Sequence, residues 1–209
     1  MRSSPRFIGL AIALVAVLAG CGSASASVSF STAGACLSDG RAPGAYPELE
    51  ALVPATLAGK PPTTLDSGRN CSDKALGSLT THGVHELRFG GGTWDAGGGA
   101  GTSIATLGLA DDDLPVAWIE EFYELGARTA SKTDNVSTSR PTLASVGPAF
   151  RVDALNDLSF QSIVVWPVGS RVRVVIVASP VSPSASMADH DAQVEAAVAA
   201  AAPVPVLSP

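Results

Sequence analysis

Residues 160–178 read FQSIVVWPVGSRVRVVIVA, the stretch whose structure the sequence predicts most clearly. Two runs rich in β-branched residues, 160–168 and 171–178, flank Gly169-Ser170, a pair that fits a tight turn between antiparallel strands. In the second run Val172, Val174 and Ile176 share one face, while Arg171 and Arg173 begin the opposite face. The stretch therefore predicts an antiparallel β-hairpin.

The segments around this hairpin supply further strands and two helices. Residues 102–110 and 142–152 have the composition of strands. Residues 114–128 place Val116, Ile119 and Tyr123 on one helical stripe, which predicts an amphipathic helix. A last helix runs to about residue 200 after Ser186 and Asp189, which are spaced as a capping box. The order β-α-β-β-β-α predicts an α+β fold, an antiparallel sheet with helices packed on one face.

A small disulfide-bridged helical segment is expected before the sheet, over residues 36–89. Pro47 opens an apolar helical pattern that ends near Gly59, and Ser72 is placed to cap a second short helix. Residues 84–89 alternate as a strand. Residues 36–202 are thus expected to form one domain, in which 102–202 supply the sheet and two helices. Residues 203–209 are expected to be a disordered tail.

Residues 90–101 (GGGTWDAGGGAG) form the most glycine-rich part of the chain. A glycine-rich loop can cradle phosphate when it opens a helix. The spacing here matches neither G-x-G-x-x-G nor the P-loop, and no helix is expected to follow. The preferred interpretation is a flexible connector between strands, with Trp94 fixing its middle.

The first 21 residues carry a targeting signal. Arg2 and Arg6 precede an apolar run, residues 7–18, which ends in Leu18-Ala19-Gly20-Cys21. This tetrad resembles the lipobox of bacterial lipoproteins. The resemblance implies that residues 1–20 are a signal peptide, that cleavage precedes Cys21, and that Cys21 is lipidated. An ordinary secretory signal with a cysteine nearby is the alternative.

The lipobox implies a lipid-anchored location on the extracytoplasmic face of a cell membrane. Twelve apolar residues are too few to span a bilayer core, which needs about 20. Two or three acyl chains would give a stable anchor. Residues 21–35 are then expected to be the lipidated cysteine followed by a flexible tether. The sequence does not indicate which leaflet holds the protein.

Cysteine use agrees with export. Once Cys21 is lipidated, only Cys36 and Cys71 remain. An even pair in an oxidising compartment predicts one disulfide. A metal-binding thiol pair is the alternative, but no C-x-x-C motif or cysteine–histidine cluster accompanies it.

Charge limits the partners. Without Arg2 and Arg6 the chain keeps 11 basic residues against 19 acidic ones, a net charge of −8. An acidic chain argues against nucleic acid and against electrostatic docking on anionic lipid. Attachment to the membrane is therefore assigned to the lipid at Cys21 alone.

No residue pattern assigns a reaction. The chain has no G-x-S-x-G or S-x-x-K motif, so no catalytic residue, metal ligand or cofactor is assigned. The sequence favours a non-catalytic binding or structural module of the cell envelope. Its expected partners are a small apolar ligand, a wall polymer or another envelope protein. The alternative is an envelope hydrolase or metal-binding protein that uses His82 and His85, with Glu86 or Asp95 as companions.

Overall fold

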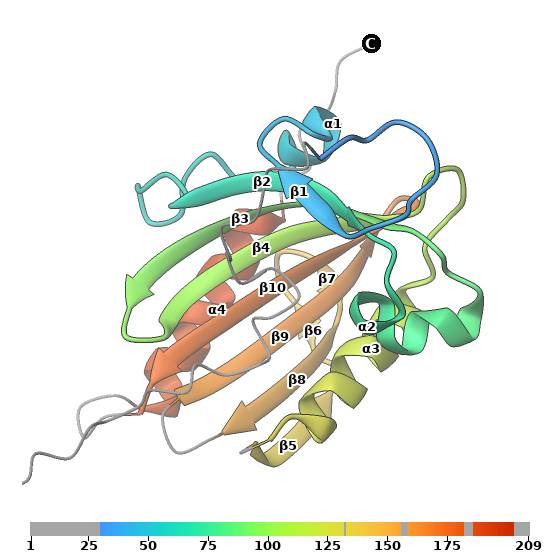
Figure 1. Cartoon of the computed structure of the whole chain (residues 1–209). Helices are drawn as coiled ribbons and strands as arrows, with labels where there is room; N and C mark the ends of the chain where they lie inside the picture. The colour runs from blue at the N-terminus through green and yellow to red at the C-terminus, as the bar shows by residue number, and fades with distance from the viewer. Residues whose placement is uncertain (1–29, 132, 156–158, 182–185, 203–209) are drawn as a thin grey trace, which may run out of the picture.

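The computed structural model describes residues 30–131, 133–155, 159–181 and 186–202. Its centre is one eight-stranded antiparallel sheet with the strand order β1-β2-β3-β4-β10-β9-β8-β5 (Figure 1). The strands of this sheet are β1 (Gly40–Ala42), β2 (Thr64–Asn70), β3 (Leu87–Gly97), β4 (Ala100–Gly108), β5 (Asp134–Ser139), β8 (Phe150–Leu155), β9 (Ser159–Val168) and β10 (Arg171–Pro180). The helices are α1 (Pro47–Glu50), α2 (Asp73–Leu76), α3 (Val116–Thr129) and α4 (Met187–Ala201), and the 3-10 helix η2 (Gly77–His82) follows α2. A separate two-stranded ribbon pairs β6 (Thr142–Leu143) with β7 (Gly147–Pro148). The antiparallel α+β architecture expected from the sequence is confirmed.

The β9–β10 hairpin lies inside this sheet. Arg171 pairs with Val168 across the Gly169-Ser170 turn, and pairing continues without interruption to Pro180 and Ser159. Gly169 has a φ of 60°, a left-handed conformation that glycine adopts without strain. On its other side β10 pairs with β4, and β9 pairs with β8, so both edges of the hairpin are hydrogen-bonded within the sheet.

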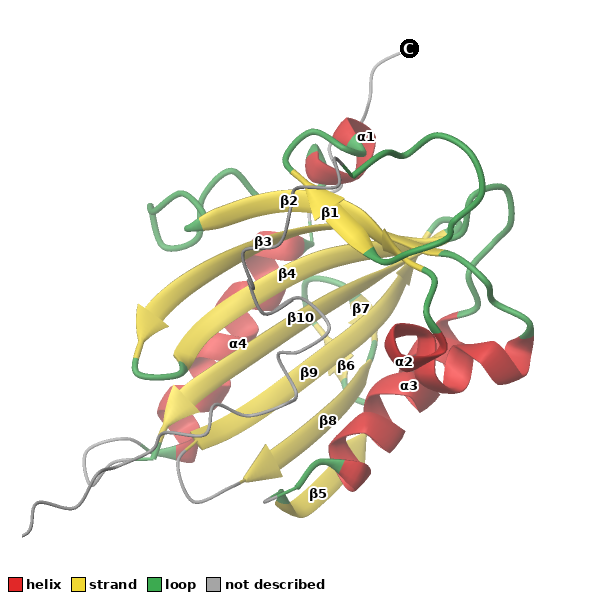
Figure 2. Ribbon diagram, viewed as in Figure 1, coloured by secondary structure: helices red, strands yellow, loops and turns green. Residues whose placement is uncertain are grey.

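The two long helices cover opposite faces of the sheet, whereas the sequence predicted helices on one face. Val172 and Val174 belong to the core under α3, and Val175 and Val177 belong to the core under α4. Figure 2 shows α4 behind the sheet and α3 on the other side. The reason lies in the sequence of β10, which has apolar side chains on both faces of the strand, so both faces of the sheet must be covered.

The segment 36–89, expected to be mainly helical, contributes strands to the sheet. β1 and β2 pair with each other, and β2 pairs with β3 over seven residues. β2 reads TLDSGRN, which lacks the alternating apolar pattern of a strand, although its last five residues are buried. α1 is only four residues long. Ser72 caps α2 as predicted, because its hydroxyl accepts the backbone N–H of Ala75.

The prediction of a flexible loop over residues 90–101 is wrong. These residues belong to β3 and β4, and only the turn at Gly97–Gly99 has positive φ angles. Glycine stands at positions 90 and 92 inside β3 because the α1 region packs directly on them and leaves no room for a side chain. A Cβ at Gly90 would lie 2.6 Å from Leu49, and a Cβ at Gly92 would lie 2.7 Å from Val53.

The remaining elements match the sequence more closely. The helix predicted over 114–128 is α3, and α4 begins at the predicted capping box of Ser186 and Asp189. The strand predicted over 142–152 is divided among β6, β7 and β8. No helix in the described ranges is long and apolar enough to cross a membrane. The predicted signal peptide, the lipidation site Cys21 and the tail 203–209 lie outside the described residues.

Candidate binding site

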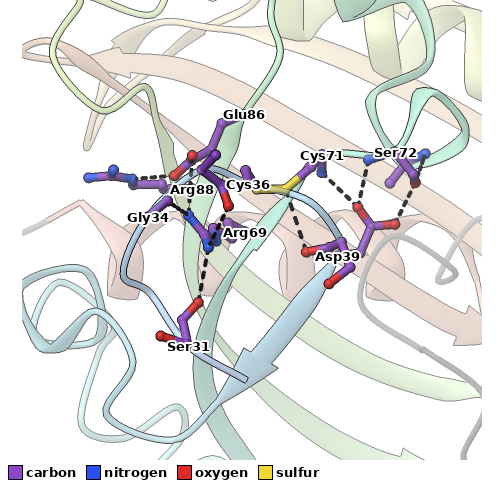
Figure 3. Close-up of a disulfide and its surroundings, with 12 residues drawn as sticks. Ser31, Gly34, Cys36, Asp39, Arg69, Cys71, Ser72, Glu86 and Arg88 are labelled. Atoms are coloured by element: carbon purple, nitrogen blue, oxygen red, sulfur yellow. Dashed lines mark hydrogen bonds and ion pairs between the residues drawn. A yellow bond between two sulfur atoms is a disulfide. The ribbon is translucent and has the colours of Figure 1, made fainter. Parts of the chain in front are cut away.

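Cys36 and Cys71 form a disulfide that joins the segment before β1 to the end of β2 (Figure 3). Their Cα atoms are 5.8 Å apart, within the normal range for a bridge. Asp39 reinforces this junction: its carboxylate accepts the backbone N–H groups of Cys71 at 2.6 Å and of Ser72 at 2.8 Å. Burial alone would raise the pKa of Asp39, but these hydrogen bonds outweigh it and lower the pKa. The predicted pairing is present.

Arg69 holds the residues before the disulfide against the sheet. Its Nη2 donates to the carbonyl of Ser31 at 3.0 Å, and its Nη1 donates to the carbonyl of Gly34 at 3.0 Å. Phe30 packs on the small core around α1. Residues 30–35 are therefore part of the folded domain, although the sequence assigned them to a flexible tether. We call this segment the N-terminal strap.

His82 and His85 do not converge on one site. His82 Nε2 lies 2.9 Å from Glu121 of α3, and its ring stacks on Trp118 at a centroid distance of 4.7 Å. His85 is exposed. The two acids considered as companions are engaged elsewhere: Glu86 pairs with arginines, and Asp95 accepts the backbone N–H of Gly97. The described residues contain no group of three or more metal-binding side chains.

A shallow groove of 290 Å³ runs beside α3, next to the His82–Glu121 pair. Arg140 crosses it, pairing with Glu120 through two hydrogen bonds of 3.0 and 2.6 Å and lying 5.0 Å above the ring of Phe150. The groove is lined by Ala117, Glu120, Glu121, Glu124, Leu125, Arg128, Arg140 and Phe150. These lining residues include no hydroxyl or thiol that could act as a nucleophile.

A second histidine makes the contact expected of a catalytic pair, but in a sealed position. His190 Nε2 lies 2.8 Å from the hydroxyl of Ser162, and both residues are at most 1% exposed between β9 and α4. The Ser162 hydroxyl donates to Asp153 and accepts from Arg151. Since its proton is already given to Asp153, the serine cannot give it to the histidine. The pair therefore joins α4 to the sheet.

The strongest anomaly on the α4 face is Arg173, which is 0% exposed. Its Nη1 donates to the carbonyl of Leu52 at 2.7 Å, while its Nε and Nη2 have no hydrogen-bond partner among the described residues. Burial lowers the pKa of Arg173 to about 10, so the guanidinium remains charged at neutral pH. A buried charge is normally paired, because desolvation strongly disfavours an unpaired one.

Arg173 lies in a row of residues that crosses four strands on one face. It is paired with Thr106 of β4 on one side and with Trp166 of β9 on the other, and Thr106 is paired with Gly90 of β3. Thr106 is also 0% exposed, and its hydroxyl has no partner within the described ranges. Leu49 covers Gly90 from the α1 side. Two adjacent buried side chains thus hold three unused polar atoms, and this pair is the candidate binding site.

From the sequence, Arg173 was expected beside Arg171 at the start of the face opposite Val172, and it was not predicted to be a site residue. A signal was nevertheless present. Val175 and Val177 share the face of Arg173, so this face of β10 is apolar beyond the two arginines, as the face with Val172 and Val174 is throughout. A strand that is apolar on both faces is covered on both, and an arginine in such a strand must be buried. The unpaired atoms themselves could not be read from the sequence.

Comparison with known proteins gives no relative from which a function could be transferred: no family model, no curated protein and no solved structure matches the chain.

Proposed function

We propose that this protein is a lipid-anchored binding module on the extracytoplasmic face of a cell membrane, and that it does not catalyse a reaction. The anchor would be the acyl chains on Cys21. The N-terminal strap supports a position close to the bilayer, because Phe30 already packs on the domain and lies only nine residues after Cys21. At roughly 3.4 Å per residue, even a fully extended connection spans only about 30 Å.

The observation that carries the binding function is the unpaired, fully buried guanidinium of Arg173. A sheet needs no such charge for its own packing, and an apolar side chain in its place would usually be neutral or stabilising. A ligand that accepts hydrogen bonds from the unused donors would compensate the buried charge and explain why an arginine stands at this position. The two histidine sites favour binding over catalysis, because the groove next to one has no nucleophile in its lining and the other is sealed under α4.

Native mass spectrometry of the exported, membrane-extracted protein tests this function. The protein is released from its detergent micelle in the gas phase, and its mass is compared with the mass measured after denaturation. We expect an excess mass that is lost on denaturation, and a separate covalent mass that stays with the peptide containing Cys21. Cys21→Ala should lose the covalent mass and the membrane association but keep the non-covalent mass. A protein that never carries a non-covalent mass, and that no added compound stabilises, would contradict the binding function.

A further inference from the structure

We propose that the Arg173–Thr106 pair is a binding site for an amphiphilic anion, with a carboxylate or phosphoryl head on the guanidinium and an apolar body against the neighbouring core. This inference rests on the proposed binding function and names the class of ligand.

The two free nitrogens of Arg173 lie on one edge of the guanidinium. Nη1 is used by the carbonyl of Leu52, and the remaining donors, Nε and Nη2, point in the same direction as a two-pronged fork. That fork matches two oxygens of one carboxylate or phosphate group, which is the preferred partner of arginine. A neutral acceptor with a single oxygen would fill only one prong.

Thr106 adds a third unused polar atom, on the residue of β4 that is paired with Arg173. Directly paired residues on neighbouring antiparallel strands have Cβ atoms about 5 Å apart, and Thr106 is the residue on β4 that pairs with Arg173. Its hydroxyl lacks a partner among the described residues and can donate to the same anion. Valine has nearly the same shape and would pack in this place without an unused polar group, so packing alone does not require a threonine.

The other arginines show that this chain normally pairs its cations. The described ranges contain eight arginines, and six of them form ion pairs: Arg41, Arg69, Arg88, Arg128, Arg140 and Arg151. Arg171 and Arg173 are the two that have no acidic partner in these ranges, and they lie two residues apart on the same face of β10. Arg171 is partly exposed. A partly exposed arginine two residues from a buried one adds positive charge at this end of β10, which attracts anions.

The apolar body is inferred from the flanks of the pair. Trp166 is paired with Arg173 on β9, and Val175 follows on the same face of β10. Val53 and Leu57, which follow α1, and Val168 of β9 are only partly buried against the same core. A headgroup held at Arg173 would therefore be surrounded by apolar side chains, which favour an amphiphile over a free inorganic ion.

A purely structural role of Arg173 would give a different experimental result. If Arg173 only fastens the segment after α1 through the Leu52 carbonyl, its charge gains nothing from an anion, and Arg173→Met should destabilise the protein with or without ligand. If Arg173 is a binding residue, the same variant removes an uncompensated charge and should leave the ligand-free protein at least as stable as the wild type. The stability of the free protein and its response to anions therefore separate the two roles.

The test uses the exported, lipidated full-length chain in nanodiscs of neutral lipid, with urea unfolding followed by tryptophan fluorescence. The probes are hexanoate, hexyl phosphate, hexan-1-ol and inorganic phosphate. The variants are Arg173→Met, Arg173→Lys and Thr106→Val, with Arg128→Lys on the surface of α3 as the control. Binding to the folded state raises the unfolding midpoint in proportion to the logarithm of ligand concentration.

We expect hexanoate or hexyl phosphate, but not hexanol, to raise the midpoint of the wild type and of Arg128→Lys equally. The stronger of the two heads identifies the ligand as a carboxylate or a phosphate ester. Arg173→Lys keeps the charge without the fork and should weaken binding by about tenfold; Thr106→Val should weaken it less, and Arg173→Met should abolish it. The proposal would be overturned if hexanoate and hexyl phosphate shifted the unfolding midpoints of the wild type and of Arg173→Lys equally. It would also be overturned if inorganic phosphate or hexanol raised the midpoint of the wild type as much as the two amphiphilic anions do. If Arg173 is not involved but native mass spectrometry finds a bound molecule, the binding function stands and only this site is wrong.

Discussion

Ser162 of β9 and His190 of α4 are 28 residues apart in the sequence, yet the serine Oγ lies 2.8 Å from the histidine Nε2. The contact is one link in a polar layer, because Ser162 also contacts Asp153 and Arg151, and Arg151 reaches Asp191 of α4 at 2.5 Å. On the other side of the ring, His190 Nδ1 lies 2.9 Å from the Ser179 hydroxyl. This layer fixes how α4 lies on the sheet, while the apolar contacts of Val194 and Val198 supply the burial.

Ser162→Ala should therefore reduce stability without affecting ligand binding. The variant removes the hydrogen bonds of Ser162 to Asp153 and to His190 Nε2, so that among the described residues Asp153 keeps only Arg151 and His190 keeps only Ser179. A buried polar atom that loses a partner in this way costs about 1–3 kcal/mol. Urea unfolding would measure the lower free energy of unfolding. Ser78→Ala is the matched control, since the buried Ser78 hydroxyl has no partner in the described structure and its removal should be close to neutral. Equal losses for both variants would contradict the role assigned to this layer.

His190 should make the stability of the protein depend on pH. Burial lowers the pKa of His190 below its ordinary value of 6.5, and the nearby Arg151 lowers it further, although Asp191 and Asp153 oppose the shift. The unfolded chain then binds a proton at a higher pH than the folded protein. Stability due to neutral His190 is therefore complete above about pH 6.5 and decreases as the pH falls from there towards the folded-state pKa.

Unfolding midpoints measured between pH 8 and pH 5 test this dependence. We expect the wild type to lose stability over that range and His190→Gln, which keeps polar atoms but does not titrate, to lose less. His82→Gln is the control, because His82 is partly exposed. A profile for His190→Gln that runs parallel to that of the wild type would show that another group carries the effect.

The disulfide should stabilise the protein by limiting the conformational freedom of the unfolded chain. It joins cysteines 35 residues apart, and closing a loop of that length contributes about 3–4 kcal/mol on the chain-entropy model. Cys36→Ser combined with Cys71→Ser should therefore lower the free energy of unfolding by that order, while the native protein should be two protons lighter than its reduced form. The contacts of Asp39 and Arg69 should keep the double variant folded, with faster hydrogen exchange confined to the N-terminal strap and β1. Exchange that is unchanged there would contradict the proposed coupling between the bridge and the strap.

The sequence predicted the parts of the fold that depend on neighbouring residues. The Gly169-Ser170 hairpin, α3 and the capping box of α4 are all encoded within a few residues, and the disulfide followed from counting cysteines. β2 was missed because its burial comes from β1, β3 and the α1 region, and not from a pattern of its own. The candidate site was missed for a related reason: Thr106 and Arg173 become neighbours only through the register of β4 and β10.

The glycines of β3 show how a local signal can mislead. Gly90-Gly91-Gly92 favours a loop by composition, but the three residues are buried in a strand that pairs on both sides. Gly90 and Gly92 face the α1 region, whereas Gly91 faces the opposite side, where a Cβ would meet its nearest neighbour, the Cβ of Ala105, at 3.4 Å. The absence of a side chain is therefore needed at alternate positions, which is the period of a strand and not of a loop.

Gly90→Ala and Gly91→Ala form a matched pair that tests this interpretation. At Gly90 the new methyl group would lie 2.6 Å from the backbone carbon of Leu49, so α1 must move away from the sheet, at a cost of about 1–3 kcal/mol. At Gly91 the methyl group makes an ordinary contact, and the smaller freedom of alanine in the unfolded chain should make the change neutral or slightly stabilising. Because Leu52 follows α1 and its carbonyl accepts from Arg173, Gly90→Ala should also weaken anion binding, while Gly91→Ala should not. Equal effects of the two changes on stability would mean that α1 does not pack on β3 through these glycines.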